Sequence, residues 1–325
     1  MKKTKNVLLG FALFVLLVSC ASTPADNSQP KHTSQEKNTE KSEPKQIEIQ
    51  IQETPEELFL KSLEGISIKK VSSPKEITKG RSFSEPFVFS ALKADGSAAE
   101  GLALILEYPA SKSENQINYE KIELITDSEG KISFTAEQPS FSAKTTVKVY
   151  PAPVSDDAEL AEKLKAFTAE ADWKVKSDIA ARGAVLFVWD YNEKDRPINN
   201  SYDIQAEFRS RGITMVGNGP VNETSYIGKP KSLYKDTYDI IGGTSYGYLI
   251  YGTIKFDQVV TANEDGDGYT CILKAEIEAV TMKSGEKVYT TEIKYESKGK
   301  NWNECVSKGK EKLAELVVND IIYGL

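Results

Sequence analysis

Histidine is almost missing from this sequence. The 325 residues contain one, His32, and it lies in a polar stretch near the N-terminus. Nucleophilic catalysis by Ser-His-Asp or Cys-His groups needs an imidazole base, and His-rich zinc sites need several imidazoles. The remainder of the chain therefore lacks the side chain on which both kinds of chemistry depend.

Long hydrophobic runs are also scarce. The longest stretch of this kind, Val7 to Val18, has twelve residues and follows a basic start that carries Lys2, Lys3 and Lys5. A transmembrane helix needs about 20 apolar residues, whereas a basic head with a short apolar middle is typical of a secretory signal peptide. We therefore predict a cleaved signal at residues 1–19.

The end of this run carries a resemblance. Leu17-Val18-Ser19-Cys20 resembles the bacterial lipobox, in which the cysteine is acylated and becomes the new first residue. The resemblance implies a lipid anchor at Cys20, and two or more acyl chains give stable membrane attachment. Ala21 follows, where an aspartate would mark inner-membrane retention, so the resemblance also implies the outer membrane, with the body on its periplasmic or its surface side.

Acidic residues outnumber basic ones in this sequence. The chain has 41 lysines and arginines against 48 acids, a net charge of −7. Cleavage before Cys20 would remove three lysines and no acid, which makes the mature charge −10. Phosphate binding needs an excess of basic residues, so nucleic acid is not an expected partner, and the acyl chains are the expected membrane contact.

Cysteine is rare, and once Cys20 is assigned to lipid, one pair remains. An even pair in an exported protein is a candidate disulfide. By strand periodicity Cys271 shares a face with Leu273, and Cys305 lies on the apolar stripe of the last expected helix. A bridge is reachable if that helix packs on that face. We predict this disulfide, with two buried thiols as the alternative.

Composition divides the rest of the chain into three parts. Residues 20–46 contain no Ile, Leu, Val or aromatic residue and cannot offset the entropy of ordering, so we expect a disordered tether. Residues 47–153 are expected to be an all-β domain, and residues 154–325 an α/β (α+β) domain with a mixed sheet and a terminal helix. The predicted fold class is thus mixed.

The β-rich region begins with alternating isoleucines at 47–51 and a short helix that starts near Pro55. Short apolar stretches then alternate with turn signals, which is typical of a β-sandwich. The expected strands are 66–71, 87–94, 102–108, 122–126, 131–136 and 145–150. The hairpin at 125–134, with Asp127 and Gly130, resembles the "T-D-x-x-G-x-x-x-F" hairpin of bacterial immunoglobulin-like (Big-type) domains, which implies a spacer or docking module.

The C-terminal region alternates helical and strand patterns. A helix is expected from about residue 155, docked on this second domain, and the apolar run 184–189 is expected to be a strand covered on both faces. Helices are expected at 201–211, 232–241 and 301–322, strands at 213–216 and 248–256, and a long hairpin at 269–281 and 287–295 around Ser284-Gly285.

This order, with Tyr248 to Ile254 before the long hairpin and Met282 to Val288 at its turn, resembles the envelope lipoprotein domains of the curli-export (CsgG) and penicillin-binding-protein-activator (LpoB) type. The likeness covers roughly residues 183–323, although Gly247 stands where those domains often carry an acid. It implies a non-enzymatic protein that works with a protein partner of the cell envelope.

Three other patterns look like binding sites. Residues 263–268 resemble the start of an EF-hand loop, but the twelfth position is Lys274 instead of a bidentate acid. Residues 242–247 lack the Gly-Lys-Ser/Thr ending of a phosphate loop. Tyr246, Tyr248 and Tyr251 with Trp189 could form a ligand surface, although alternating tyrosines on a strand usually pack. We therefore expect no metal and no cofactor.

The preferred hypothesis is a non-catalytic outer-membrane lipoprotein that acts as a binding or scaffold component in envelope assembly or regulation, without catalytic residues. Two alternatives stay open. A hydrolase of envelope glycan would need two carboxylates across a cleft, and the sequence does not select them. A small-ligand binding protein would use the tyrosine-rich strand.

Overall fold

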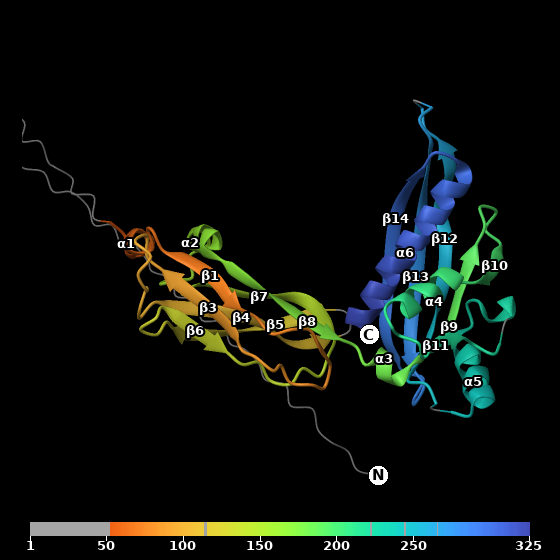
Figure 1. The fold of residues 1–325 in the computed structure, drawn as a ribbon, viewed down its shortest axis with the longest axis horizontal. Helices are drawn as coiled ribbons and strands as arrows, with labels where there is room; N and C mark the ends of the chain where they lie inside the picture. The colour runs from red at the N-terminus through yellow and green to blue at the C-terminus, as the bar shows by residue number, and fades with distance from the viewer. Residues whose placement is uncertain (1–52, 114–115, 222, 244, 265) are drawn as a thin grey trace, which may run out of the picture. The chain divides into compact units, whose positions relative to one another are not determined.

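The computed structural model describes residues 53–325 apart from 114–115, 222, 244 and 265. The predictions for the signal peptide, Cys20, Ala21, His32, the tether and the strand at 47–51 lie outside these residues. Glu53–Leu325 form one compact unit, a mixed α+β protein with three sheets among the described residues (Figure 1).

Two of these sheets make up the β-rich part. Its first sheet has the strand order β1-β3-β6, and its second the order β2-β8-β7-β4-β5. The bounds are β1 (Ser67–Ser72), β2 (Ile77–Thr78), β3 (Phe87–Leu92), β4 (Ala103–Ser113), β5 (Gln116–Ile125), β6 (Lys131–Phe134), β7 (Ala143–Pro151) and β8 (Ala169–Lys176). All six strands predicted between residues 66 and 150 are present, with shifted ends.

One hydrophobic core joins the two sheets. Phe87 on β3 stacks on Trp173 on β8, with ring centroids 5.8 Å apart and planes within 8°. Both side chains are almost fully buried, and Leu104, Val147 and Val149 belong to the same cluster. Because side chains from both sheets meet in one core, this part is a two-layer β structure.

The expected end of the β-rich part at residue 153 is corrected by β8. This strand pairs antiparallel with β7, so the second sheet continues to Lys176. The preceding helix α2 (Ala158–Leu164) was expected to dock on the C-terminal domain. Instead Leu160 and Leu164 pack with Leu63, beside α1 (Pro55–Ser62), which Thr54 caps at its N-terminus.

The third sheet forms the C-terminal part. Its strand order is β10-β9-β12-β13-β14, and β11 pairs with β9 on the same side as β10. The bounds are β9 (Ala184–Tyr191), β10 (Pro197–Asn200), β11 (Val216–Asn218), β12 (Tyr248–Ala262), β13 (Tyr269–Thr281) and β14 (Lys287–Gly299). β9 runs parallel to β12, and β12, β13 and β14 are antiparallel.

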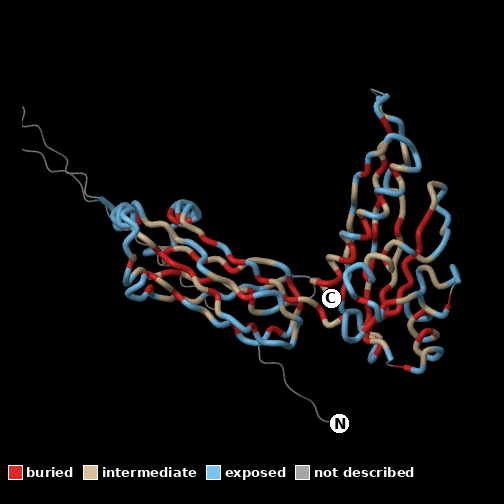
Figure 2. Tube along the Cα trace, in the orientation of Figure 1, coloured by how far each residue is buried: buried red, intermediate tan, exposed pale blue. Residues whose placement is uncertain are grey.

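The two faces of this sheet bury different side chains. All eight residues of β9 are buried, as the continuous apolar run predicted (Figure 2). Leu186 and Val188 face a core that also contains side chains of α4 and α6, whereas Val185 and Phe187 belong to a second core with Leu233 of α5. The helices are α3 (Ile179–Arg182), α4 (Tyr202–Ser210), α5 (Pro230–Ile241) and α6 (Trp302–Gly324), with short 3₁₀ turns at Lys165–Phe167 and Thr224–Tyr226.

Helix α6 approaches the sheet closely at Gly309. A Cβ atom there would lie 2.9 Å from Leu273 Cδ1 and 2.9 Å from Ser297 Cβ. Only a residue without a side chain therefore lets the helix lie this near to β13 and β14. No helix in the described part of the chain has the length and apolar character to cross a membrane.

Candidate ligand-binding cavity

The register of three strands places a group of mainly aromatic side chains on the face of the third sheet that α5 covers. Phe187 on β9 lies beside Tyr251 on β12, and Tyr251 lies opposite Glu278 on β13. Two residues further along, Trp189 lies beside Thr253. Since side chains alternate along a strand, these five residues share one face.

The first turn of α5 and the chain that leads into it line a cavity opposite these strand residues. Tyr226, Ile227, Gly228, Pro230 and Leu233 form this side of the cavity, which has a volume of about 270 Å³. The hydroxyl of Tyr226 donates a hydrogen bond to Asp236 Oδ2 on α5 at 2.9 Å, which fixes the position of this ring over the sheet. The volume is just below the roughly 300–1,000 Å³ typical of ligand pockets, so it suits a small molecule.

One ionisable acid lies in the lining. Glu278 accepts a hydrogen bond from the Tyr251 hydroxyl, with 2.6 Å between the oxygens. Burial first, and then this contact with Glu278, raise the pKa of Tyr251, so the phenol stays neutral and remains a donor. The cavity thus combines four aromatic rings with one negative charge and no lysine or arginine.

The structure brings together only part of the aromatic group that the sequence indicated. Trp189 and Tyr251 line the cavity, and Tyr246 packs at the edge of the same core. Tyr248 points to the opposite face, where its hydroxyl donates to Asp178. The grouping of Tyr248 with Tyr251 was wrong because neighbours three apart on a strand face opposite ways.

Sequence reasoning missed Phe187, Tyr226 and Glu278. Phe187 carried a usable signal, since it lies two residues before Trp189 and so shares its face. Tyr226 and Glu278 carried none, because their approach to Trp189 depends on strand order and on the path of the chain before α5.

The two cysteines of the predicted bridge meet in the core beneath α6. Cys305 Sγ lies 3.4 Å from Cys271 Sγ, and both residues are buried free thiols. Burial, reinforced by the contact with Cys305, raises the pKa of the Cys271 thiol to about 12. The structure brings the pair together, and the disulfide itself stays a prediction.

A buried ion pair lies between β9 and α6. Asp190 is 4% exposed, and its Oδ2 atom lies 3.2 Å from Lys310 Nζ, while its Oδ1 atom has no hydrogen-bond partner among the described residues. Burial raises the pKa of Asp190, and the charge of Lys310 opposes that rise. Burial likewise raises the pKa of nearby Asp203.

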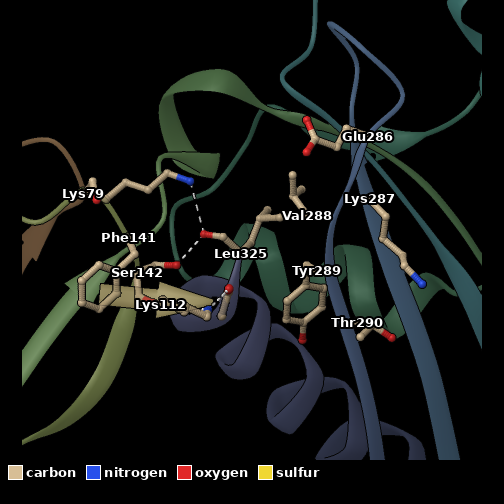
Figure 3. A pocket seen from close by; sticks show the side chains of 12 residues that line it. Lys79, Lys112, Phe141, Ser142, Glu286, Lys287, Val288, Tyr289, Thr290 and Leu325 are labelled. Atoms are coloured by element: carbon tan, nitrogen blue, oxygen red, sulfur yellow. Dashed lines mark hydrogen bonds between the residues drawn. The ribbon is translucent and has the colours of Figure 1, made fainter. Parts of the chain in front are cut away.

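A second cavity, of about 580 Å³, contains lysines that are already engaged (Figure 3). Lys79 Nζ donates to the carbonyl oxygen of Leu325 at 3.3 Å, Lys112 to that of Gly324, and Ser142 also donates to Leu325. Burial lowers the pKa of Lys112. These donors hold the end of α6, so this cavity is a weaker candidate for a ligand than the aromatic one.

The loops that imitate known motifs are turns. Asn263 donates from its main chain to the carbonyl of Gly268 at 2.9 Å, closing the β12–β13 hairpin, and Gly242 has the left-handed conformation that ends α5. No group of three or more metal-ligating side chains occurs among the described residues.

Comparisons with solved structures give weak likenesses. The PelC dodecamer from Paraburkholderia phytofirmans is 16% identical, over 44% of this chain and 87% of that one, with a TM-score of 0.27. Lipoprotein GNA1162 from Neisseria meningitidis is 14% identical, over 42% and 96%, with a TM-score of 0.24. Spo0M, the sporulation control protein from Bacillus subtilis, is 7% identical, over 79% and 99%, with a TM-score of 0.20. Scores this low assign neither fold nor function to this chain.

A search of curated proteins gives no match to this sequence. Residues 183–322 match the family described as "TP0693-like lipoprotein, C-terminal domain". The matched range begins just before β9 and ends near the end of α6, so it contains the whole third sheet and the aromatic cavity. This match supports the identification of the chain as a bacterial lipoprotein.

Proposed function

We propose that this protein is a non-catalytic lipoprotein, attached to the outer membrane through lipid on Cys20, that works by binding. The sequence at 17–20 supports the anchor, and the family match supports a lipoprotein. The β-rich part, immunoglobulin-like by its hairpin motif, serves as a spacer, and the C-terminal part, CsgG- and LpoB-like by its motifs, carries the binding site.

The aromatic cavity is the observation that carries this proposal. It is lined by residues from four separate segments, and its volume of about 270 Å³ suits a small molecule better than a polymer chain. Glycosidases of both stereochemical classes use two carboxylates roughly 5–9.5 Å apart. The cavity contains one, Glu278, so its chemistry favours holding a ligand over cleaving a glycan.

A bulky side chain at Thr253 should abolish binding. Thr253 is half-buried on β12 and lines the cavity, so Thr253→Trp would fill the space while keeping a residue that strands accept. We expect a thermal-shift screen of small molecules against the full chain to find compounds that stabilise the wild type by about 2.7 kcal/mol at a hundredfold excess over Kd. The same compounds should leave Thr253→Trp unshifted.

Compounds that shift both proteins equally would place binding elsewhere, and a screen without any hit would contradict the proposal. Turnover of peptidoglycan fragments by the wild type would replace it with the hydrolase hypothesis.

A protein partner is the second candidate, and a specific surface favours it. Trp302 on α6 and Ile198 on β10 are 43% and 54% exposed, and both line a shallow cavity of about 250 Å³ with Phe256 and Val306. Exposed tryptophan beside apolar side chains is typical of interface hot spots. An envelope partner seen with the wild-type chain by native mass spectrometry should be lost in Trp302→Ser, and retention would exclude this surface.

A further inference from the structure

The charges around the aromatic cavity select a class of ligand. Glu278 is the one ionised group in the lining, so the cavity has negative potential in an apolar surrounding. An anion would meet this carboxylate, and Lys287, the cation that pairs with it, lies outside the lining. A fatty acyl chain would find a short cavity of about 270 Å³ whose lining includes four aromatic side chains, Phe187, Trp189, Tyr226 and Tyr251.

The partners of Glu278 leave its charge available. Its Oε2 atom accepts a hydrogen bond from the Tyr251 hydroxyl. This hydroxyl is neutral and does not compensate the negative charge of the carboxylate. Its Oε1 atom lies 3.2 Å from Lys287 Nζ, but the Lys287 side chain is 55% exposed. A pair this exposed contributes little free energy, so a ligand in the cavity can displace the lysine.

The rings supply the rest of the site. The faces of tryptophan and tyrosine attract cations through the ring quadrupole, worth about 0.5–1 kcal/mol in water and about 2 kcal/mol when desolvated. Alkylated ammonium groups suit such sites because they are cations with an apolar surface. Trp189 is 5% exposed and Phe187 1%, so protein atoms cover most of these two rings, whereas Tyr226 and Tyr251 are half-buried and offer a ligand more ring surface.

We propose that the aromatic cavity binds a small organic cation with an alkylated ammonium group, held between the rings of Trp189, Tyr226 and Tyr251 and the carboxylate of Glu278. This rests on the proposed function, because it names the ligand of the same cavity. The source of the group, a free amine or the headgroup of a lipid, is left to the experiment.

Calorimetric titration of the full chain in a maltoside detergent tests the charge directly. The probes are choline, its neutral isostere 3,3-dimethyl-1-butanol, and glycerophosphocholine as the headgroup form. We expect choline to bind at least about tenfold more tightly than the isostere, the factor that corresponds to about 1.4 kcal/mol. Glycerophosphocholine binding as tightly as choline would indicate a lipid headgroup, and weaker binding would indicate a free amine.

Two substitutions on β13 distinguish the effect of the charge inside the cavity from the effect of the overall charge of the protein. Glu278→Gln should weaken the binding of choline at least about tenfold and leave the affinity for the neutral isostere unchanged. Glu276→Gln is the matched control, because it removes the same charge from the same strand face but lies outside the lining. Lys287→Met should strengthen choline binding by about two- to fivefold, since it removes the competing cation.

The failures of the two proposals are distinguishable. If the isostere binds as tightly as choline, and Thr253→Trp abolishes both, the cavity is a binding site and the cation assignment is wrong. If neither choline nor glycerophosphocholine binds the wild type, the cation assignment is overturned, while a hit from the thermal-shift screen would still support a ligand of another class.

Discussion

Lys310→Met is expected to lower the free energy of unfolding by about 3–5 kcal/mol at pH 7, because it leaves Asp190 charged and unpaired in the core. Asp190 is 4% exposed, and Lys310 is the cation that contacts it, with 3.2 Å between Nζ and Oδ2. The second carboxylate oxygen already lacks a hydrogen-bond partner among the described residues. Removal of the lysine therefore leaves a buried charge with no compensation.

The loss should shrink in acid. Burial raises the pKa of Asp190 in the folded protein, and Lys310 counteracts this rise, so the methionine variant raises the pKa further. The folded protein then binds a proton at a pH where the unfolded chain, with a pKa of about 3.9, does not. Its stability relative to the unfolded state therefore increases as the pH falls, and the deficit at pH 5 should be smaller than at pH 7.

Urea unfolding at both pH values provides the measurement. Lys312→Met is the matched control, since Lys312 lies on the same helix with its side chain 42% exposed and forms an ion pair with the exposed Glu315. We expect it to change stability by less than about 0.5 kcal/mol. Adding Asp190→Asn to Lys310→Met should restore most of the loss, and equal effects of Lys310→Met and Lys312→Met would contradict the account.

The second large effect concerns the two cysteines of the core. If Cys271 and Cys305 are bridged in the exported protein, reduction should lower the free energy of unfolding by about 2–4 kcal/mol. The bridge would tie β13 to the first turns of α6, two elements that already share one core. The structure supports this prediction by placing the two sulfur atoms 3.4 Å apart.

Alkylation in denaturant, without a reductant, followed by mass spectrometry reports the state of the pair. The prediction is that neither Cys271 nor Cys305 is alkylated until a reductant is added. Cys305→Ala should reproduce the stability loss in the oxidised protein, and a reductant should have no further effect on it. Alkylation of both cysteines in protein freshly taken from the envelope would refute the bridge.

Local patterns in the sequence predict much of the C-terminal part. The continuous apolar run of β9, the hairpin turn at Ser284-Gly285 and the apolar stripe of α6 each determine a structure through neighbours close in the chain. β8 was missed although Ala169, Ala171, Trp173 and Val175 alternate with polar residues, the period of a strand. Two of these four side chains are only alanine, so the pattern was weak.

The site could be predicted only in fragments. Trp189 and Tyr251 were grouped from the sequence as aromatic residues on two expected strands, with ordinary packing as the alternative. Their meeting with Phe187 and Glu278 depends on the register of β9, β12 and β13, which short-range periodicity does not fix. Tyr226 reaches the cavity through a segment that no local signal places over the sheet.

Native mass spectrometry of the chain, released from its own membranes in mild detergent, tests the central claim most directly. The account predicts a polypeptide that begins at Cys20, carries acyl chains and retains a small non-covalent organic molecule, which the Thr253→Trp variant loses. An unmodified polypeptide that still carries residues 1–19, or an acylated chain without any bound molecule in either protein, would contradict it.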